Sequence, residues 1–99
     1  MRPIHVAQLD KARPVLVLTR EIVRPHMNTV TIAPITTTIR GLSTEVPVGT
    51  ANGLNEGGVV ACDHVTSIPA RALGSQIGRL LDEQEATLTE AIHAAFDLE

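Results

Sequence analysis

Residues 12–38 read ARPVLVLTREIVRPHMNTVTIAPITTT, and this stretch decides the fold. It contains two runs rich in aliphatic and β-branched residues, at 13–19 and 28–36, which are typical of β-strands. Consecutive strands are usually neighbours in a sheet, so we expect the two runs to pair as antiparallel strands. Arg13 stands at the start of the first run and Thr36 at the end of the second. An antiparallel pairing would bring these two side chains to the same end of the sheet.

Further short strand patterns, separated by turns, fill most of the remaining chain. Residues 10–12 leave room only for a tight hairpin turn before the second strand. Pro34 and Pro47 each lack a backbone donor, which predicts a bulge or a break in the third strand's ladder near Thr36 and an edge position for the fourth strand. Between 64 and 72 we expect irregular structure with one helical turn after Pro69. The expected strands are 3–9, 13–19, 28–36, 43–48, 59–62 and 75–80.

The clearest helix pattern spans 82–96. Asp82 is a good N-cap, and Glu85 follows three residues later, at the spacing of a capping box. Leu88 and Phe96 lie on one apolar helix face, which we expect to pack on the core. About six short strands and one amphipathic helix predict a mainly β fold, a small twisted β-barrel or half-barrel with a C-terminal helix.

Length and composition favour one folded domain over residues 1–99. Hydrophobic residues make up 43% of the chain, which argues against disorder. No apolar run approaches the roughly 20 residues that span a bilayer, and the N-terminus lacks the apolar region of a signal peptide. Cys62 is the one cysteine in the sequence, so it has no partner for an internal disulfide. These features predict a cytoplasmic protein without a membrane segment.

The charges are divided unevenly along the chain. The net charge is −3, which argues against general nucleic-acid binding. Residues 1–40 nevertheless contain six basic and two acidic side chains, whereas residues 41–99 contain two basic and nine acidic ones. The two parts therefore carry net charges of +4 and −7. Such a division indicates a basic face for an anion, although ordinary solvated surface produces the same pattern.

Five segments together resemble the toxin endoribonucleases of the MazF/PemK family. They are ARPVLVLTR, TIAPITTT, GGVVACDHVTSIP, IGRLL and AAFDL, and their order and spacing cover nearly the whole chain. The resemblance implies an SH3-like barrel, shared with CcdB-like toxins, that assembles as a homodimer. It also implies cleavage of single-stranded RNA at short sequences without a metal ion or other cofactor. An antitoxin would inhibit the enzyme by laying an extended, acidic C-terminal segment over the RNA groove.

The resemblance places the family's catalytic arginine on Arg13 and its catalytic threonine on Thr36. In metal-free RNA cleavage, a ribose 2′-OH attacks the adjacent phosphorus and leaves a 2′,3′-cyclic phosphate and a 5′-hydroxyl. Charge accumulates on the phosphoryl oxygens, which a guanidinium fork matches in a bidentate manner. The Thr36 hydroxyl can donate to the same oxygens as an oxyanion donor.

Other polar side chains are candidates for RNA contact. The chain has no Trp or Tyr, so specificity has to come from hydrogen bonds, loop shape and arginine stacking rather than from aromatic platforms. The four histidines and Cys62 show no metal-ligand spacing, and we expect no role for His5 or His93 and a buried position for Cys62. The RNA-binding candidates are Arg20, Arg24, His26, Thr37, Arg40 and His64.

The sequence departs from the family pattern at three places. Family members commonly have a long polar loop before the catalytic arginine, but here only residues 10–12 remain. An acidic residue often precedes the arginine by a few positions, and Gln8 stands there. His64 occupies a position where an amide is common. The role of His64 and the effect of the short loop are therefore open.

Two other functions remain as alternatives. A toxin of the same fold can act by protein binding, as the gyrase poisons related to CcdB do. An inactive module kept for antitoxin binding is the other alternative. Neither requires a guanidinium fork and a hydroxyl together, so the presence of both Arg13 and Thr36 favours the nuclease.

Overall fold

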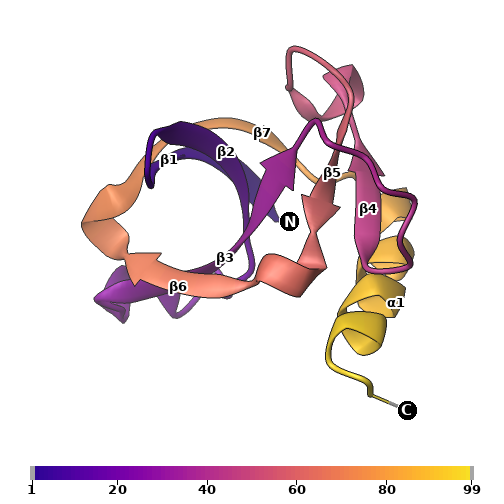
Figure 1. Cartoon of the computed structure of the whole chain (residues 1–99). Coiled ribbons are helices and arrows are strands. Elements are labelled where there is room, and N and C mark those ends of the chain that lie inside the picture. The colour runs from indigo at the N-terminus through magenta and orange to yellow at the C-terminus, as the bar shows by residue number, and fades with distance from the viewer. Residues whose placement is uncertain (1, 99) are drawn as a thin grey trace.

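The computed structural model describes residues 2–98, and over this range the strands form one seven-stranded antiparallel sheet. The sheet order is β4-β5-β3-β2-β1-β7, and β6 pairs with β3 beside this path. Figure 1 shows β1, β2, β3, β6 and β7 curling into a ring, with β4, β5 and α1 to one side. The edge strands β4 and β7 do not pair with each other in the described part of the chain, so the SH3-like barrel is open. The strands are β1 Pro3–Gln8, β2 Ala12–Val17, β3 Thr29–Thr36, β4 Glu45–Val48, β5 Gly58–Ala61, β6 Thr66–Pro69 and β7 Leu73–Arg79.

The helices are short except for the last. The single α-helix in the described range is α1, Glu85–Ala95, at the C-terminal end of the chain. No helix among residues 2–98 combines the length and the apolar character needed to cross a lipid bilayer. The 3₁₀ turns are η1 Arg24–His26, η2 Thr50–Asn52, η3 Cys62–His64, η4 Ala70–Ala72 and η5 Asp82–Gln84.

Strand β3 joins the two parts of the sheet because it changes partners at Pro34. Val15 of β2 lies opposite Pro34, and the ladder with β2 ends there. Ile35 and Thr36 instead pair with β5. Proline has no N–H to donate, so the ladder is interrupted at that residue and the strand can turn toward a new neighbour. This confirms the break that the sequence predicts and places Thr36 at the bend.

Two hydrophobic cores explain the continuous apolar run in β2. Val15 and Val17 face the inside of the ring, where they pack with residues such as Ile32. Leu16 points to the opposite side of the sheet and belongs to a second core that includes Leu88 of α1. Side chains alternate between the faces of a strand, so a strand covered on both sides needs apolar residues at every position. Burying each such side chain contributes about 1.5–3 kcal/mol to folding.

Strand β6 corrects the expectation of irregular structure between 64 and 72. Thr66–Pro69 pairs with the first half of β3, from Thr29 to Ile32. In β6 only Ile68 is buried, so the segment lacks the alternating pattern that identifies a strand from sequence. The segment forms a strand because the edge of β3 offers it backbone hydrogen-bond partners. The helical turn expected after Pro69 is confirmed as η4.

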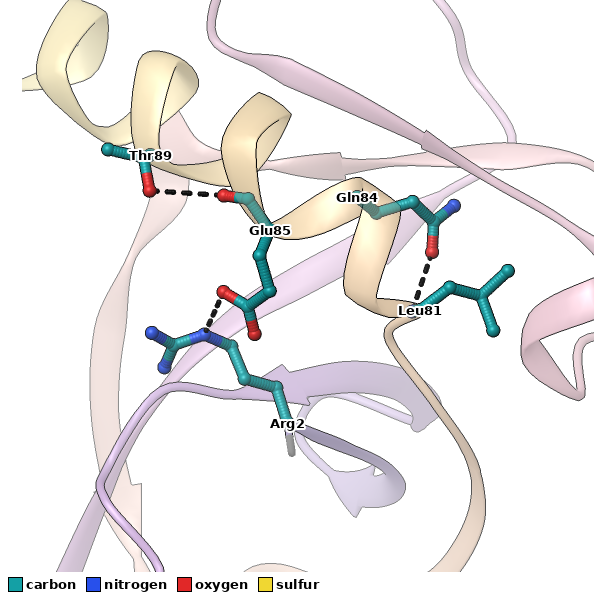
Figure 2. Close-up of polar contacts among 5 residues, drawn as sticks. All are labelled: Arg2, Leu81, Gln84, Glu85 and Thr89. Atoms are coloured by element: carbon teal, nitrogen blue, oxygen red, sulfur yellow. Dashed lines mark hydrogen bonds and ion pairs between the residues drawn. The ribbon is translucent and has the colours of Figure 1, made fainter.

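The start of the C-terminal helix also differs from the expectation. A 3₁₀ turn comes first, and the Gln84 side chain caps it: the Leu81 N–H donates to Gln84 Oε1 at 2.9 Å (Figure 2). Glu85 does not close a capping box with Asp82. Its carboxylate instead accepts a hydrogen bond from Arg2 Nε at 3.1 Å. Arg2 therefore binds Glu85 in place of the expected cap and links the start of β1 to α1.

Two side chains have surroundings that the sequence did not indicate. Phe96 is 55% exposed because α1 ends at Ala95 and Phe96 lies beyond its last turn. His5 is buried inside the ring, where its Nδ1–H donates to the Gly74 carbonyl at 2.8 Å. The other ring nitrogen, Nε2, then faces Arg24 Nη1 at 3.4 Å as an acceptor. His5 thus has a structural role, although we expected none.

Candidate functional site

Arg13 stands at the second position of β2, where the hairpin turn brings an acidic partner to it. Ala7 lies opposite Arg13, and residues between them form the tight turn. Asp10 in this turn accepts two hydrogen bonds from the guanidinium, Nε to Oδ1 at 2.9 Å and Nη2 to Oδ2 at 3.1 Å. The Lys11 N–H also donates to Asp10 Oδ1, at 3.0 Å. The bidentate geometry holds the guanidinium fork in a defined orientation at an open surface.

The electrostatics of this pair favour the charged forms of both groups. The hydrogen bond from Arg13 lowers the pKa of the Asp10 carboxyl from 3.8 to about 2, although the loss of some hydrating water works the other way. The hydrogen bond to Asp10 correspondingly raises the pKa of Arg13 above its usual value. The site therefore holds a carboxylate and a guanidinium at neutral pH. An incoming phosphate would compete with Asp10 for the guanidinium fork.

Thr36 is the last residue of β3 and lies near Arg13, as the sequence predicts. The β2–β3 ladder ends at Pro34, two positions before Thr36, and Arg13 and Thr36 line the same two cavities. Thr36 Oγ1 accepts a hydrogen bond from the Thr38 N–H at 3.1 Å. Because this bond uses an oxygen lone pair, the hydroxyl hydrogen of Thr36 stays available to donate. The fold thus places a phosphate-matched fork and a hydroxyl donor in the lining of the same cavities.

Two cavities lie on either side of this pair, and Arg13, Ile35 and Thr36 line both of them. The Lys11 cavity has a volume of about 540 Å³ and includes Thr37 and Leu54 in its wall. The His64 cavity has a volume of about 380 Å³. Its polar lining residues include Arg40, Glu45, Asp63 and His64. The shared wall formed by Arg13 and Thr36 is therefore reachable from both sides.

The other RNA-binding candidates fall into two groups. Thr37 lines the Lys11 cavity, and Arg40 and His64 line the His64 cavity. Arg20, Arg24 and His26 lie in the loop that follows the opposite end of β2, and they line neither cavity. Arg24 of this group is engaged with His5. The structure thus brings three candidates to the Arg13–Thr36 pair and keeps three away from it.

Asp10 is the residue of the site that sequence reasoning missed. The family pattern places an acidic residue at Gln8, which is exposed and pairs with Ala12 at the end of the hairpin. Asp10 is in the turn itself, three positions before Arg13. The usable signal was the shortness of the turn, because a tight hairpin folds its tip back over the first residues of the next strand. Glu45 and Asp63 were not singled out either, and both line the His64 cavity.

The structure gives no sign of thiol or metal chemistry in the described residues. Cys62 is buried, as predicted, and its burial, helped by the charge of Asp63, raises the pKa of the thiol to about 11. The reactive thiolate is therefore scarce at neutral pH. Asp63 itself accepts a hydrogen bond from Thr44 Oγ1 at 2.6 Å. Within the described range, no three His, Cys, Asp or Glu side chains gather as metal ligands would.

Comparisons with known proteins found similar sequences and similar folds. A family model described as "PemK-like, MazF-like toxin of type II toxin-antitoxin system" matches residues 3–96. "Endoribonuclease MazF3" of Mycobacterium tuberculosis (strain ATCC 25618 / H37Rv) is 67% identical over 99 residues, covering 100% of this chain and 96% of that protein. The solved structure of "Mycobacterium tuberculosis toxin MazF-mt6" has a TM-score of 0.97 and 66% identity, with 99% of each chain covered.

A more distant solved structure shares the fold alone. It is an endoribonuclease in complex with its cognate antitoxin from mycobacterial species, with a TM-score of 0.85 and 21% identity. The alignment covers 98% of this chain and 93% of that one. Because the family model and the 67% identical relative each span essentially the whole sequence, the chain belongs to the family of PemK-like, MazF-like toxins of type II toxin–antitoxin systems.

Proposed function

We propose that this toxin is an endoribonuclease that cleaves single-stranded RNA at the wall shared by its two cavities. The observation that carries the proposal is the placement of the Arg13 guanidinium and the Thr36 hydroxyl on that wall. A chain lying across the wall would put one phosphate on the pair and the flanking nucleotides into the two cavities. The endoribonuclease name of the 67% identical relative supports the same activity.

The chemistry follows from the groups present. The scissile phosphate takes the place of Asp10 on the Arg13 fork, and Thr36 donates to a phosphoryl oxygen as charge develops there. The Asp10 carboxylate, released from the guanidinium, accepts the proton of the ribose 2′-OH. The 2′-oxygen forms a bond to phosphorus, and the bond from phosphorus to the 5′-oxygen breaks. The departing 5′-oxygen takes a proton from water, which leaves a 2′,3′-cyclic phosphate and a 5′-hydroxyl.

Sequence specificity would come from the cavity walls. The Lys11 cavity carries a lysine, Asn55 and Glu56, and the His64 cavity carries Arg40, Asp63 and His64. These side chains supply both donors and acceptors for base edges. The described walls contain no Phe, Tyr or Trp side chain, so hydrogen bonding, loop shape and arginine stacking have to carry most of the recognition. Contacts of RNA with Arg20, Arg24 and His26 stay a prediction and would require RNA to extend along the β2–β3 loop.

The partners follow from the family. A toxin of a type II system has an antitoxin, and the fold neighbour was solved in complex with its own. We infer that an acidic, extended antitoxin segment covers the Arg13–Thr36 wall and excludes RNA. A homodimer and a cytoplasmic location, both expected from the sequence, complete the proposal. The gyrase-poison and inactive-module alternatives need no cleavage chemistry at this wall, and the experiment below separates them from the nuclease.

The test is cleavage of single-stranded RNA by purified protein in EDTA, with mapping of the new ends. We expect fragments with 5′-hydroxyl ends, and we expect Arg13→Ala and Thr36→Ala each to lower kcat by about 100-fold or more while remaining folded by circular dichroism. Arg71→Ala and Thr87→Ala are matched controls, since both residues are exposed and line neither cavity. Full cleavage by the Arg13→Ala protein, or a wild-type protein that leaves RNA intact, would reject the nuclease.

A further inference from the structure

The loop between β3 and β4 is organised around one carboxylate. The backbone N–H groups of Arg40, Gly41 and Leu42 all donate to Glu45 Oε1, at 3.2, 2.9 and 3.2 Å. Gly41 has φ of +72°, and this left-handed residue turns the successive N–H groups toward the same side. The Glu45 N–H donates back to the Leu42 carbonyl at 3.1 Å. Glu45 therefore fills a nest of three backbone donors, which we call the 40–42 nest.

The loop held by this nest belongs to the proposed RNA site. Thr38, Arg40, Leu42 and Thr44 line the His64 cavity, and Glu45 closes the same wall. At its other end the loop contacts Thr36, through the Thr38 N–H on the threonine hydroxyl. The conformation of residues 37–44 thus determines one wall of the cavity next to the shared Arg13–Thr36 wall.

Arg40 is the basic side chain that this loop carries into the cavity. Its guanidinium is exposed and, within the described range, makes no hydrogen bond or ion pair, whereas Arg13 is engaged by Asp10. An exposed arginine on a short loop has many conformations, and holding its backbone reduces the entropy lost on binding a phosphate or base. The 40–42 nest holds the backbone at Arg40 itself.

We propose that Glu45 is a positioning residue, which holds residues 37–44 so that Arg40 meets the RNA in the His64 cavity. This rests on the proposed function, because it assigns a role in binding the same substrate. Glu45 does not act on RNA directly. As an anion near a phosphate path it would repel RNA, so any loss of affinity on its removal has to come through the loop. Weaker RNA binding after removal of Glu45 therefore indicates positioning, whereas tighter binding indicates simple charge repulsion.

The test compares Glu45→Ala, Glu45→Gln, Arg40→Ala and the Glu45→Ala/Arg40→Ala double variant. Each is assayed on a single-stranded RNA that the wild-type protein cuts and on its 2′-deoxy analogue at the cut position. We expect Glu45→Ala to raise KM for the RNA and Kd for the analogue about tenfold, because the loss of one charge-assisted contact has an effect of this size. The value of kcat should stay within about threefold of the wild type. Glu45→Gln keeps the Oε1 acceptor and should stay within about threefold of the wild type in KM.

The double variant shows whether Glu45 acts through Arg40. We expect the Glu45→Ala change to add no more than about twofold once Arg40 is alanine, because coupled residues are not additive. Glu83→Ala is the charge control, since Glu83 is exposed in η5 and outside both cavities. Should Glu45→Ala fail to fold, Gly41→Ala replaces it: this change strains the nest at φ +72° in open space and keeps every charge.

Unchanged or tighter RNA binding by the Glu45→Ala protein, or by Gly41→Ala in its place, would overturn the proposal. Equal losses of RNA affinity with Glu45→Gln and Glu45→Ala would do the same. So would losses of affinity from Glu45→Ala and Arg40→Ala that add in the double variant. Failure of the wild-type protein to cut RNA in EDTA is a different outcome and counts against the proposed function itself. Cleavage by the wild type together with an unaffected Glu45→Ala protein rejects the positioning role alone.

Discussion

At the scale of single residues, the site couples a strong phosphate ligand to an internal counter-ion. Asp10 and Arg13 are three positions apart on a hairpin, and both are exposed enough that water screens their attraction. Such a pair orients the guanidinium fork without binding it so tightly that a phosphate cannot replace the carboxylate. The geometry therefore suits a site that has to stay ordered when empty and exchange one anion for another when RNA arrives.

The titration of Asp10 tests this pairing. With Arg13 present, the Asp10 carboxyl should titrate near pH 2, and in the Arg13→Ala protein its pKa should return toward 3.8. Because the pKa is lowered in the folded state, the ion pair stabilises that state fully at pH values above 3.8. This contribution is lost as the pH falls through about 2. Carbon-detected NMR of the Asp10 carboxyl measures both values. An identical midpoint in the two proteins would mean that the ion pair is absent in solution, and Arg71→Ala should leave the midpoint unchanged.

At the scale of elements, the wall of the Lys11 cavity depends on how one loop rests on β7. Gly53, with φ of +89°, lies against the backbone at Ile77, and Gly78 lies against the Asn52 carbonyl. The buried Asn52 side chain donates to the Arg79 carbonyl at 2.9 Å and to Gln84 Oε1 at 2.6 Å. Close backbone contact and a buried amide pair thus attach the loop, and Leu54 with its neighbours then lines the cavity.

Gly78→Ala tests this attachment. An added Cβ at Gly78 would collide with the Asn52 carbonyl, a backbone atom that cannot move aside alone. We expect a loss of about 1–3 kcal/mol in the free energy of unfolding, the usual cost of overpacking. Gly57→Ala is the matched control, because nothing lies within 4 Å of an added Cβ there and its φ is ordinary. Urea unfolding measures both, and equal stabilities of the two variants would show that the loop does not pack on β7 as described.

At the scale of the whole molecule, charge and exposed apolar surface point to partners. The first 40 residues carry a net +4 although the chain carries −3, and Arg13 and Arg40 of this half line the proposed RNA path. On another part of the surface, α1 borders a third cavity of about 340 Å³, whose lining includes Leu18, Ile92 and Phe96. Exposed apolar surface of this kind commonly marks a protein interface.

The charge distribution leads to a prediction about the antitoxin. An acidic segment that covers the phosphate-binding arginines should bind in competition with uncleavable RNA, and its association rate should fall as salt rises. Removing the charge at Arg13, Arg20 or Arg24 in turn shows which arginines steer the encounter. Stopped-flow association at low and high salt makes the measurement. Equal rates at both salt concentrations, or simultaneous binding of antitoxin and RNA, would contradict masking of the site.

The apolar surface supports the predicted homodimer. Phe96 is 55% exposed and Leu98 is 56% exposed, and both would be covered if α1 packs against a second copy. Sedimentation at micromolar concentration should give twice the 10.6 kDa mass of one chain. Phe96→Ser should shift the protein toward the monomer, whereas Ile22→Ser, at an exposed residue on the β2–β3 loop, should not. A wild-type monomer would contradict the prediction.

Local sequence patterns determined much of this protein. The continuous apolar run of β2, the break in the β3 ladder at Pro34, the presence of a C-terminal helix and the placement of Arg13 near Thr36 were all predicted. These features depend on residue periodicity, on the missing N–H of proline and on the usual pairing of consecutive strands, which are readable over a few residues. The order of five short segments was sufficient to indicate the family.

Only the tertiary structure decided the remaining features. Strand β6 forms because β3 offers an unpaired edge, and Glu85 leaves its expected cap because Arg2, 83 positions away, reaches it. Asp10 rather than Gln8 meets Arg13, and Glu45 fills the 40–42 nest, because backbone turns aim those groups. Each outcome is a competition between partners for one polar group or one strand edge. The partner that binds is the one that lies close enough in the folded chain. The order of residues alone does not give these distances.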